Sequence, residues 1–133
     1  MKLTTPAHKD SVFLTILTTF GYPGLQVEHE GEFKSVKPVK DSLVINLGDT
    51  LSRATNFKLK ATNHRVLDIG IERYSQPFFF EPAYSQVVPA NLLDDSEEAK
   101  ENDIIYGVWL INKISTAYAE WKDFKPAKKQ ATQ

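Results

Sequence analysis

Three residues of this 133-residue chain, His8, Asp10 and His64, have the types and spacing of a metal site. His8 and Asp10 are two residues apart, and side chains at positions i and i+2 of a β-strand point to the same face. One strand could therefore direct an imidazole and a carboxylate to one point. His64 follows far enough along the chain for intervening strands to bring it back beside this pair.

Two histidines and one carboxylate form the facial triad of non-haem Fe(II) oxygenases, which leaves the opposite face of an octahedral ion open. Zinc is less favoured, though not excluded, because His₂-carboxylate zinc sites usually keep one open position for water. A His-x-Asp pair taken alone is a weak signal, since such pairs are often ordinary surface residues. The spacing of His8 and Asp10 therefore needs support from other parts of the chain.

Arg73 and Ser75 form a second pair with a spacing of two. If the chain turns tightly near Gly70, an antiparallel hairpin places Ser75 opposite His64, and opposed residues project to the same face. Arg73 would then lie on the metal face, where its guanidinium could bind a carboxylate through two parallel hydrogen bonds. The alternative is an arginine paired with a surface acid, and a register slip of one residue would turn Arg73 outward.

The elements that must position these residues are mostly strands. Residues 1–90 contain short apolar runs separated by Gly, Pro and other turn residues, which is typical of an all-β sandwich or barrel. The expected strands are 11–19, 25–27, 33–36, 42–47 and a half-buried 57–61, followed by a hairpin of 66–69 and 73–80. We expect a core over 1–90, an acidic loop and a helix packed on the core over 91–124, and a flexible tail over 125–133.

Composition narrows the classes of partner. Lys plus Arg is 16 and Asp plus Glu is 17, so no basic field predicts binding to nucleic acid or to an anionic membrane. The absence of cysteine excludes thiolate zinc sites and a cysteine nucleophile. No apolar run approaches the ~18 residues of a membrane span, and the first ten residues lack the apolar stretch of a signal peptide. We therefore expect a cytoplasmic protein.

Several blocks together resemble one known family. They are His8-Lys9-Asp10, Phe13–Leu17, Gly24–Val27, Asn46–Asp49, Thr55-Asn56, His64–Val66 and Arg73–Phe79. Their order and spacing are similar to the metal-binding half of the isopenicillin N synthase-like Fe(II)/2-oxoglutarate dioxygenases, from about Pro6 to Pro89. The resemblance implies a mainly β fold, a double-stranded β-helix or cupin-like jelly roll, here truncated at its N-terminus and followed by a C-terminal α-helix.

The same resemblance implies a chemistry. Fe(II) would be held by His8, Asp10 and His64, and Arg73 and Ser75 would bind the distal carboxylate of 2-oxoglutarate. The enzyme would oxidise a small organic substrate with O2 and release succinate and CO2. Two alternatives stay open: a truncated, non-catalytic jelly-roll module for binding or assembly, and a 2-oxoglutarate-independent oxidase of the same fold.

Length adds an expectation about partners. Members of the family are usually much longer, so the chain resembles the C-terminal catalytic half of an oxygenase. A jelly roll without its first strands has open edges and uncovered apolar surface. We therefore expect either a homodimer or a partner chain that supplies the missing N-terminal half.

Overall fold

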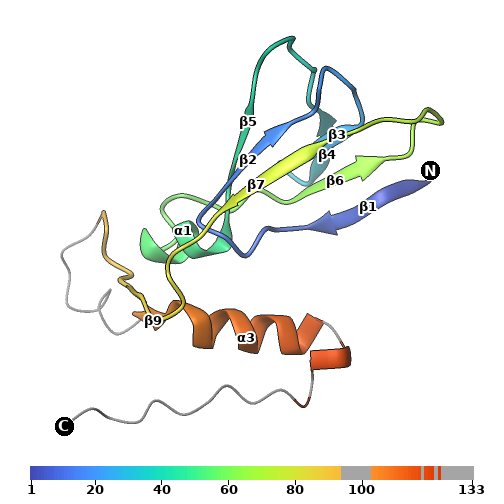
Figure 1. The fold of residues 1–133 in the computed structure, drawn as a ribbon. Coiled ribbons are helices and arrows are strands. Elements are labelled where there is room, and N and C mark those ends of the chain that lie inside the picture. Colours follow the sequence, from blue (N-terminus) through green and yellow to red (C-terminus); the bar gives the residue numbers. More distant parts are fainter. Residues whose placement is uncertain (94–102, 118, 122, 124–133) are drawn as a thin grey trace, which may run out of the picture.

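The chain folds mainly into antiparallel strands arranged in three sheets, with helices at one end (Figure 1). The computed structural model describes residues 1–93, 103–117, 119–121 and 123. A four-stranded sheet has the order β1 (Leu3–His8), β6 (His64–Leu67), β3 (Leu25–His29) and β4 (Glu32–Ser35). A three-stranded sheet has the order β5 (Val44–Leu47), β2 (Leu14–Thr18) and β7 (Gln76–Phe80), and β8 (Val87–Val88) pairs with β9 (Ile104–Ile105). The helices are α1 (Asp49–Ala54), α3 (Tyr106–Ala117) and the 3₁₀ turn η1 (Ala119–Trp121).

The strands expected at 11–19, 25–27, 33–36 and 42–47 are confirmed as β2, β3, β4 and β5, with somewhat different ends. β3 and β4 form a hairpin whose turn holds Glu30 at φ 53° and Gly31 at φ 81°. Positive φ at both central residues matches the twist of the flanking strands.

The three-stranded sheet has an unusual distribution of polarity. Thr15 in β2 is buried on the inward face, whereas Ile16 lies opposite both Ile45 of β5 and Phe78 of β7 on the outward face. Ile45 and Phe78 are 53% and 61% exposed. We name this surface the outer apolar face; it consists of Leu14, Ile16, Ile45, Leu47, Phe78 and Phe80. An antiparallel sheet with one solvated face normally turns its polar side chains outward, so this sheet presents the reverse arrangement.

The predicted hairpin of 66–69 with 73–80 is wrong. β6 pairs with β1 on one side and with β3 on the other, so it has no free edge for β7. β7 instead joins the other sheet beside β2. The register that placed Ser75 opposite His64 therefore does not exist, and both Arg73 and Ser75 lie in the connection between β6 and β7.

The predicted half-buried strand at 57–61 is also wrong. The short helix α1 precedes this segment, and the chain leaves it through a turn in which Asn56 and Phe57 have φ of 47° and 59°. Phe57 is 57% exposed, so its alternation with Lys58 does not reflect a buried strand face.

The predicted C-terminal helix is present as α3, but it begins later than expected. Ile104 and Ile105 form β9 rather than the first helical turn. Tyr106 packs in a small core with Ala54 of α1 and Val88 of β8, at the helical end of the molecule. None of the described helices is long and apolar enough to cross a membrane.

The expected division into a core, a loop with a helix, and a tail stays a prediction. Most of the acidic stretch, 94–102, lies outside the described residues, as do Tyr118 and the expected tail at 125–133.

Candidate metal centre

His8 and His64 lie directly opposite each other in the β1–β6 ladder. Directly opposed residues of an antiparallel pair project to the same face, and the two imidazole centroids are 4.3 Å apart with a 51° angle between the rings. The His64 side chain is nearly buried, whereas that of His8 is 42% exposed. This pairing brings together two histidines that are far apart in sequence.

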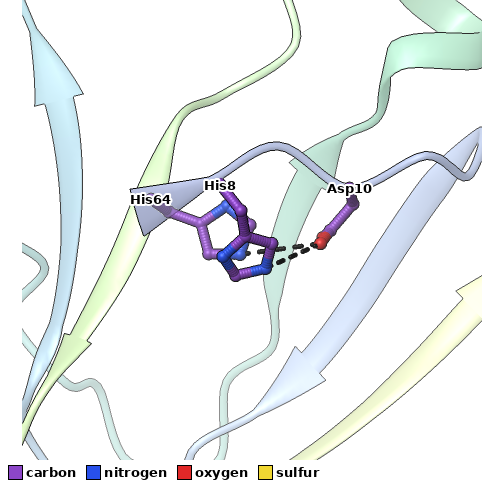
Figure 2. A group of neighbouring side chains, drawn as sticks. All are labelled: His8, Asp10 and His64. Atoms are coloured by element: carbon purple, nitrogen blue, oxygen red, sulfur yellow. Dashed lines mark ion pairs between the residues drawn. The ribbon is translucent and has the colours of Figure 1, made fainter. Parts of the chain in front are cut away.

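Asp10 completes the group by a different route from the one expected. β1 ends at His8, so Asp10 lies in the bend after the strand and does not share a strand face with His8. Its Oδ1 nevertheless lies 3.3 Å from His8 Nε2 and 3.7 Å from His64 Nε2. Figure 2 draws both contacts as dashed lines that meet at the Asp10 carboxylate. One ligand atom from each residue lies within 4.8 Å of the other two. The structure therefore gathers the three residues at one point.

The outer nitrogens of both rings face backbone carbonyls. His8 Nδ1 is 2.8 Å from the Pro6 carbonyl oxygen, and His64 Nδ1 is 3.1 Å from that of Thr62. A carbonyl can only accept, so each Nδ1 that makes this bond carries a proton, and each Nε2 keeps a lone pair directed at the shared point. Histidine ligands are commonly oriented in this way, so the donor set fits a divalent metal of the iron type.

Two further residues at the centre were missed by the sequence reading. The Thr15 hydroxyl donates to Asp10 Oδ2 at 2.6 Å, and the Asn46 amide lies 3.1 Å from His64 Nδ1. Both side chains are buried. Their signal in the sequence is a polar residue inside an otherwise apolar strand, which is notable because buried polar groups need partners.

Gly48 permits the close packing that holds Asp10 in place. A Cβ at this position would lie 1.8 Å from the Val12 carbonyl oxygen. Two backbone hydrogen bonds join the segments here. Asp49 N–H donates to the backbone carbonyl oxygen of Asp10 at 2.8 Å, and Gly48 N–H donates to that of Phe13 at 3.1 Å. The junction of β5 with α1 thus supports the bend that carries the carboxylate.

A cleft of about 720 Å³ lies beside His8 and Asp10, whereas the buried His64 does not line it. His8 and Asp10 line one side, Phe79 of β7 contributes to the wall, and Leu110 and Ile114 of α3 line the other side. This volume is within the range of small-molecule sites, roughly 300–1,000 Å³. The cleft is therefore large enough for an organic substrate next to the metal ligands.

Helix α3 is fixed beside this cleft by a charged contact. Lys113, which also lines the cleft, forms an ion pair with Asp49 in the first turn of α1. The Lys113 ammonium also lies 5.2 Å from the centroid of the Trp109 ring. The ion pair joins α3 to α1, the element that follows β5, whereas the contact with Trp109 lies within α3.

Arg73 and Ser75 lie together at a second hollow of the described structure. They line a separate hollow of about 400 Å³ with Thr5, Asp68 and Glu72 among its other walls, and none of its lining residues belongs to the His8 group. Lys2 pairs with Asp68 at 2.7 Å, which lowers the pKa of that carboxyl and raises that of Lys2. The structure thus brings Arg73 and Ser75 to one hollow, which shares Thr5 with the cleft beside the metal ligands, and their role toward a co-substrate stays a prediction.

Comparison with known proteins identifies this arrangement. The model of the 2OG-Fe(II) oxygenase superfamily matches residues 1–82, the part of the chain that contains all three clustered side chains. The chain belongs to this superfamily. The expected jelly-roll fold is confirmed by its structural neighbours, which are 2OG-Fe(II) oxygenases.

Curated relatives in the superfamily come from plants and fungi. The chain is 38% identical over 95 residues to Protein DMR6-LIKE OXYGENASE 2 of Arabidopsis thaliana, covering 70% of this chain and 27% of that protein. It is 44% identical over 81 residues to a 2-oxoglutarate-Fe(II) type oxidoreductase of Aspergillus fumigatus, covering 59% of this chain and 24% of the relative. The chain thus spans about a quarter of the length of these relatives.

The chain also superposes on solved structures of the same superfamily and again covers only part of each. A full-length protein of Neurospora crassa, solved in complex with alpha-KG, superposes with a TM-score of 0.78 at 26% identity, covering 87% of this chain and 38% of that one. The dioxygenase for auxin oxidation of rice has a TM-score of 0.77 at 28% identity, covering 87% of this chain and 42% of that one.

Proposed function

We propose that this chain is the catalytic portion of an Fe(II)- and 2-oxoglutarate-dependent dioxygenase that oxidises a small organic substrate with O2 and releases succinate and CO2. The observation that carries the proposal is the convergence of His8 Nε2 and His64 Nε2 on one Asp10 oxygen. Membership in the superfamily supports the same reading.

His8, Asp10 and His64 would hold the iron. Bound iron and 2-oxoglutarate together supply O2 activation coupled to oxidative decarboxylation. The chain contributes the orientation of the ligands and a cleft in which Phe79, Leu110 and other apolar walls would exclude water around the substrate.

Arg73 and Ser75 would anchor the distal carboxylate of 2-oxoglutarate. Two features support this role: both residues line one hollow, and Thr5 borders both this hollow and the cleft beside the metal ligands. The guanidinium fork suits a carboxylate. Asp68 and Glu72 in the same wall weaken the attraction for an anion, so the role depends on direct hydrogen bonds to the arginine.

The activity is tested by stoichiometry. The purified chain with Fe(II), O2 and 2-oxoglutarate should form succinate and CO2 in equal amounts, even slowly and without a primary substrate, and Asp10→Ala should form neither. Iron binding without any succinate would favour the non-catalytic module. Oxidation of a substrate in the absence of 2-oxoglutarate would favour the 2-oxoglutarate-independent oxidase.

We also propose that a second polypeptide covers the outer apolar face, either another copy of this chain or the N-terminal half of a longer oxygenase. The exposure of Ile45 and Phe78 on this face supports the proposal, as does the greater length of the relatives. If the occupant is a second copy, sedimentation should give a dimer that Phe78→Ser weakens, whereas Phe20→Ser, which removes an exposed ring elsewhere, should not. A monomer at all concentrations would exclude the homodimer and leave the N-terminal half to be tested by co-expression.

A cytoplasmic site of action completes the proposal. The chain has no cysteine, so its fold is compatible with a reducing compartment. Cell fractionation that recovers the protein with a secreted or organellar marker would contradict it.

A further inference from the structure

One row of side chains runs across the three-stranded sheet beneath the metal centre. Thr15 of β2 lies directly opposite Asn46 of β5 and, on its other side, opposite Phe79 of β7. Such opposed residues share a face. Thr15 and Asn46 are 4% and 8% exposed, so this part of the row is buried, whereas Phe79 is 52% exposed and lines the cleft.

Thr15 acts on one oxygen of the Asp10 carboxylate. Its hydroxyl donates to Oδ2, whereas both histidine Nε2 atoms face Oδ1. A carboxylate with one oxygen bound in this way offers the other oxygen alone to a metal. Binding through one oxygen leaves more positions on the ion open for co-substrate and O2.

Asn46 acts on the ring of His64. The Asn46 amide nitrogen, Nδ2, and the Thr62 carbonyl oxygen both lie 3.1 Å from His64 Nδ1. Because the carbonyl requires a proton on Nδ1, the ring then has no lone pair there for an amide N–H. With metal on Nε2, a half-turn of the Asn46 amide would bring its oxygen to Nδ1 in place of the nitrogen, and the two acceptors would then fix both the ring plane and the tautomer.

We propose that Thr15 and Asn46 are positioning residues of the metal centre, brought together by the β2–β5 register so that one row orients Asp10 and His64. This inference rests on the proposed function, since it takes Asp10 and His64 as ligands. Partners of metal ligands typically contribute about 10- to 100-fold to metal affinity. A purely structural pair of buried polar groups would instead change stability and leave the metal site as it was.

The test uses Co(II) as the probe, with the full chain, and follows both affinity and the visible absorption of the bound ion. Thr15→Val keeps the shape but removes the hydroxyl, whereas Thr15→Ser keeps the hydroxyl. We expect Thr15→Val to weaken Co(II) binding about 10- to 100-fold and to alter the spectrum. Thr15→Ser should restore both, and Thr18→Val, a matched change on the same strand, should alter neither.

Asn46 is tested in parallel. Asn46→Leu should weaken Co(II) binding by a similar factor, and Asn46→Asp, which retains acceptor oxygens, should bind more tightly than Asn46→Leu. The two Asn46 variants test the inference on their own if Thr15→Val does not fold. Folded Thr15→Val or Asn46→Leu with wild-type affinity and spectrum would overturn the inference. Failure of the folded wild type to bind Co(II) would instead overturn the metal centre, so the two failures are distinguishable.

Discussion

The packing of Gly48 against the Asp10 bend leads to a sharp prediction for Gly48→Ala. Gly48 has φ −93°, a conformation open to any residue, so the effect of a methyl group is steric and not conformational. The new Cβ would meet the Val12 carbonyl oxygen at 1.8 Å and its carbon at 2.7 Å. Both are backbone atoms, so the two segments must move apart until this contact exceeds 3.0 Å, below which real Cβ atoms are essentially never found. Overpacking of this kind typically costs about 1–3 kcal/mol.

The cost follows from the bonds that this separation breaks. Three backbone hydrogen bonds join the segments: Gly48 to Phe13, Asp49 to Asp10 and Thr50 to Val12. At about 1 kcal/mol each, their loss lowers the free energy of unfolding by about 3 kcal/mol. That is a large fraction of the roughly 5–15 kcal/mol typical of a domain. Because Asp10 moves with its carbonyl, Co(II) affinity should fall as well.

Urea unfolding followed by tryptophan fluorescence measures the first effect, and Co(II) titration measures the second. Gly21→Ala is the matched control. Gly21 has φ +80° with no atom within 4 Å of the place a Cβ would take, so its substitution should cost only the left-handed strain of about 1–2 kcal/mol. It should leave Co(II) affinity unchanged. If Gly48→Ala were as stable as Gly21→Ala and bound Co(II) like the wild type, the reasoning would be refuted.

Three further predictions concern single side chains. His64→Ala should lower Co(II) affinity by more than the ~100-fold expected for a residue that only orients a ligand. His29→Ala, on the exposed hairpin, is the control and should bind Co(II) like the wild type. If calorimetry gave the two variants equal Co(II) affinities, His64 would not be a ligand. Arg73→Ala should spare Co(II) binding but weaken 2-oxoglutarate binding, whereas the surface change Lys34→Ala should alter neither; unchanged 2-oxoglutarate affinity would contradict the assignment. Burial raises the pKa of Tyr106 above its ordinary 10.0. The unfolded chain therefore loses this proton first, and stability that is fully present below pH 10 declines as the pH rises further. In denaturant titrations, the free energy of unfolding of Tyr106→Phe should fall less between about pH 9 and 11 than that of the wild type. An identical fall in both proteins would show that Tyr106 is not its source.

The metal ligands could be predicted because their chemistry limits the choice of residue types and spacing. His8, Asp10 and His64 are the residues that the structure gathers. The route to Asp10 could not be predicted, since the bend after β1 depends on Gly48 packing far along the chain. Thr15 and Asn46 were missed because their role depends on the register between two strands, which no local pattern encodes.

The wrong elements have two kinds of physical origin. The hairpin prediction assumed that neighbours in sequence pair, but a jelly roll sends the successive strands β6 and β7 to different sheets. The six-residue helix α1 is too short for a helical period to be recognised. The alternation of apolar and polar residues at 57–61 resembles that of a half-buried strand. The strand prediction required Phe57 to be buried, but Phe57 is exposed. The hairpin and strand errors therefore concern non-local contacts, whereas the short helix was missed for a local reason.

The central claim is that this chain holds iron through His8, Asp10 and His64 and binds 2-oxoglutarate beside it. The most direct measurement is the visible spectrum of the purified chain with Fe(II) and 2-oxoglutarate under anaerobic conditions. We predict a metal-to-ligand charge-transfer band that is absent in Asp10→Ala and present in Asp41→Ala, which removes an exposed carboxylate elsewhere. The absence of the band from the folded wild type, or an equal band in Asp10→Ala, would contradict the account.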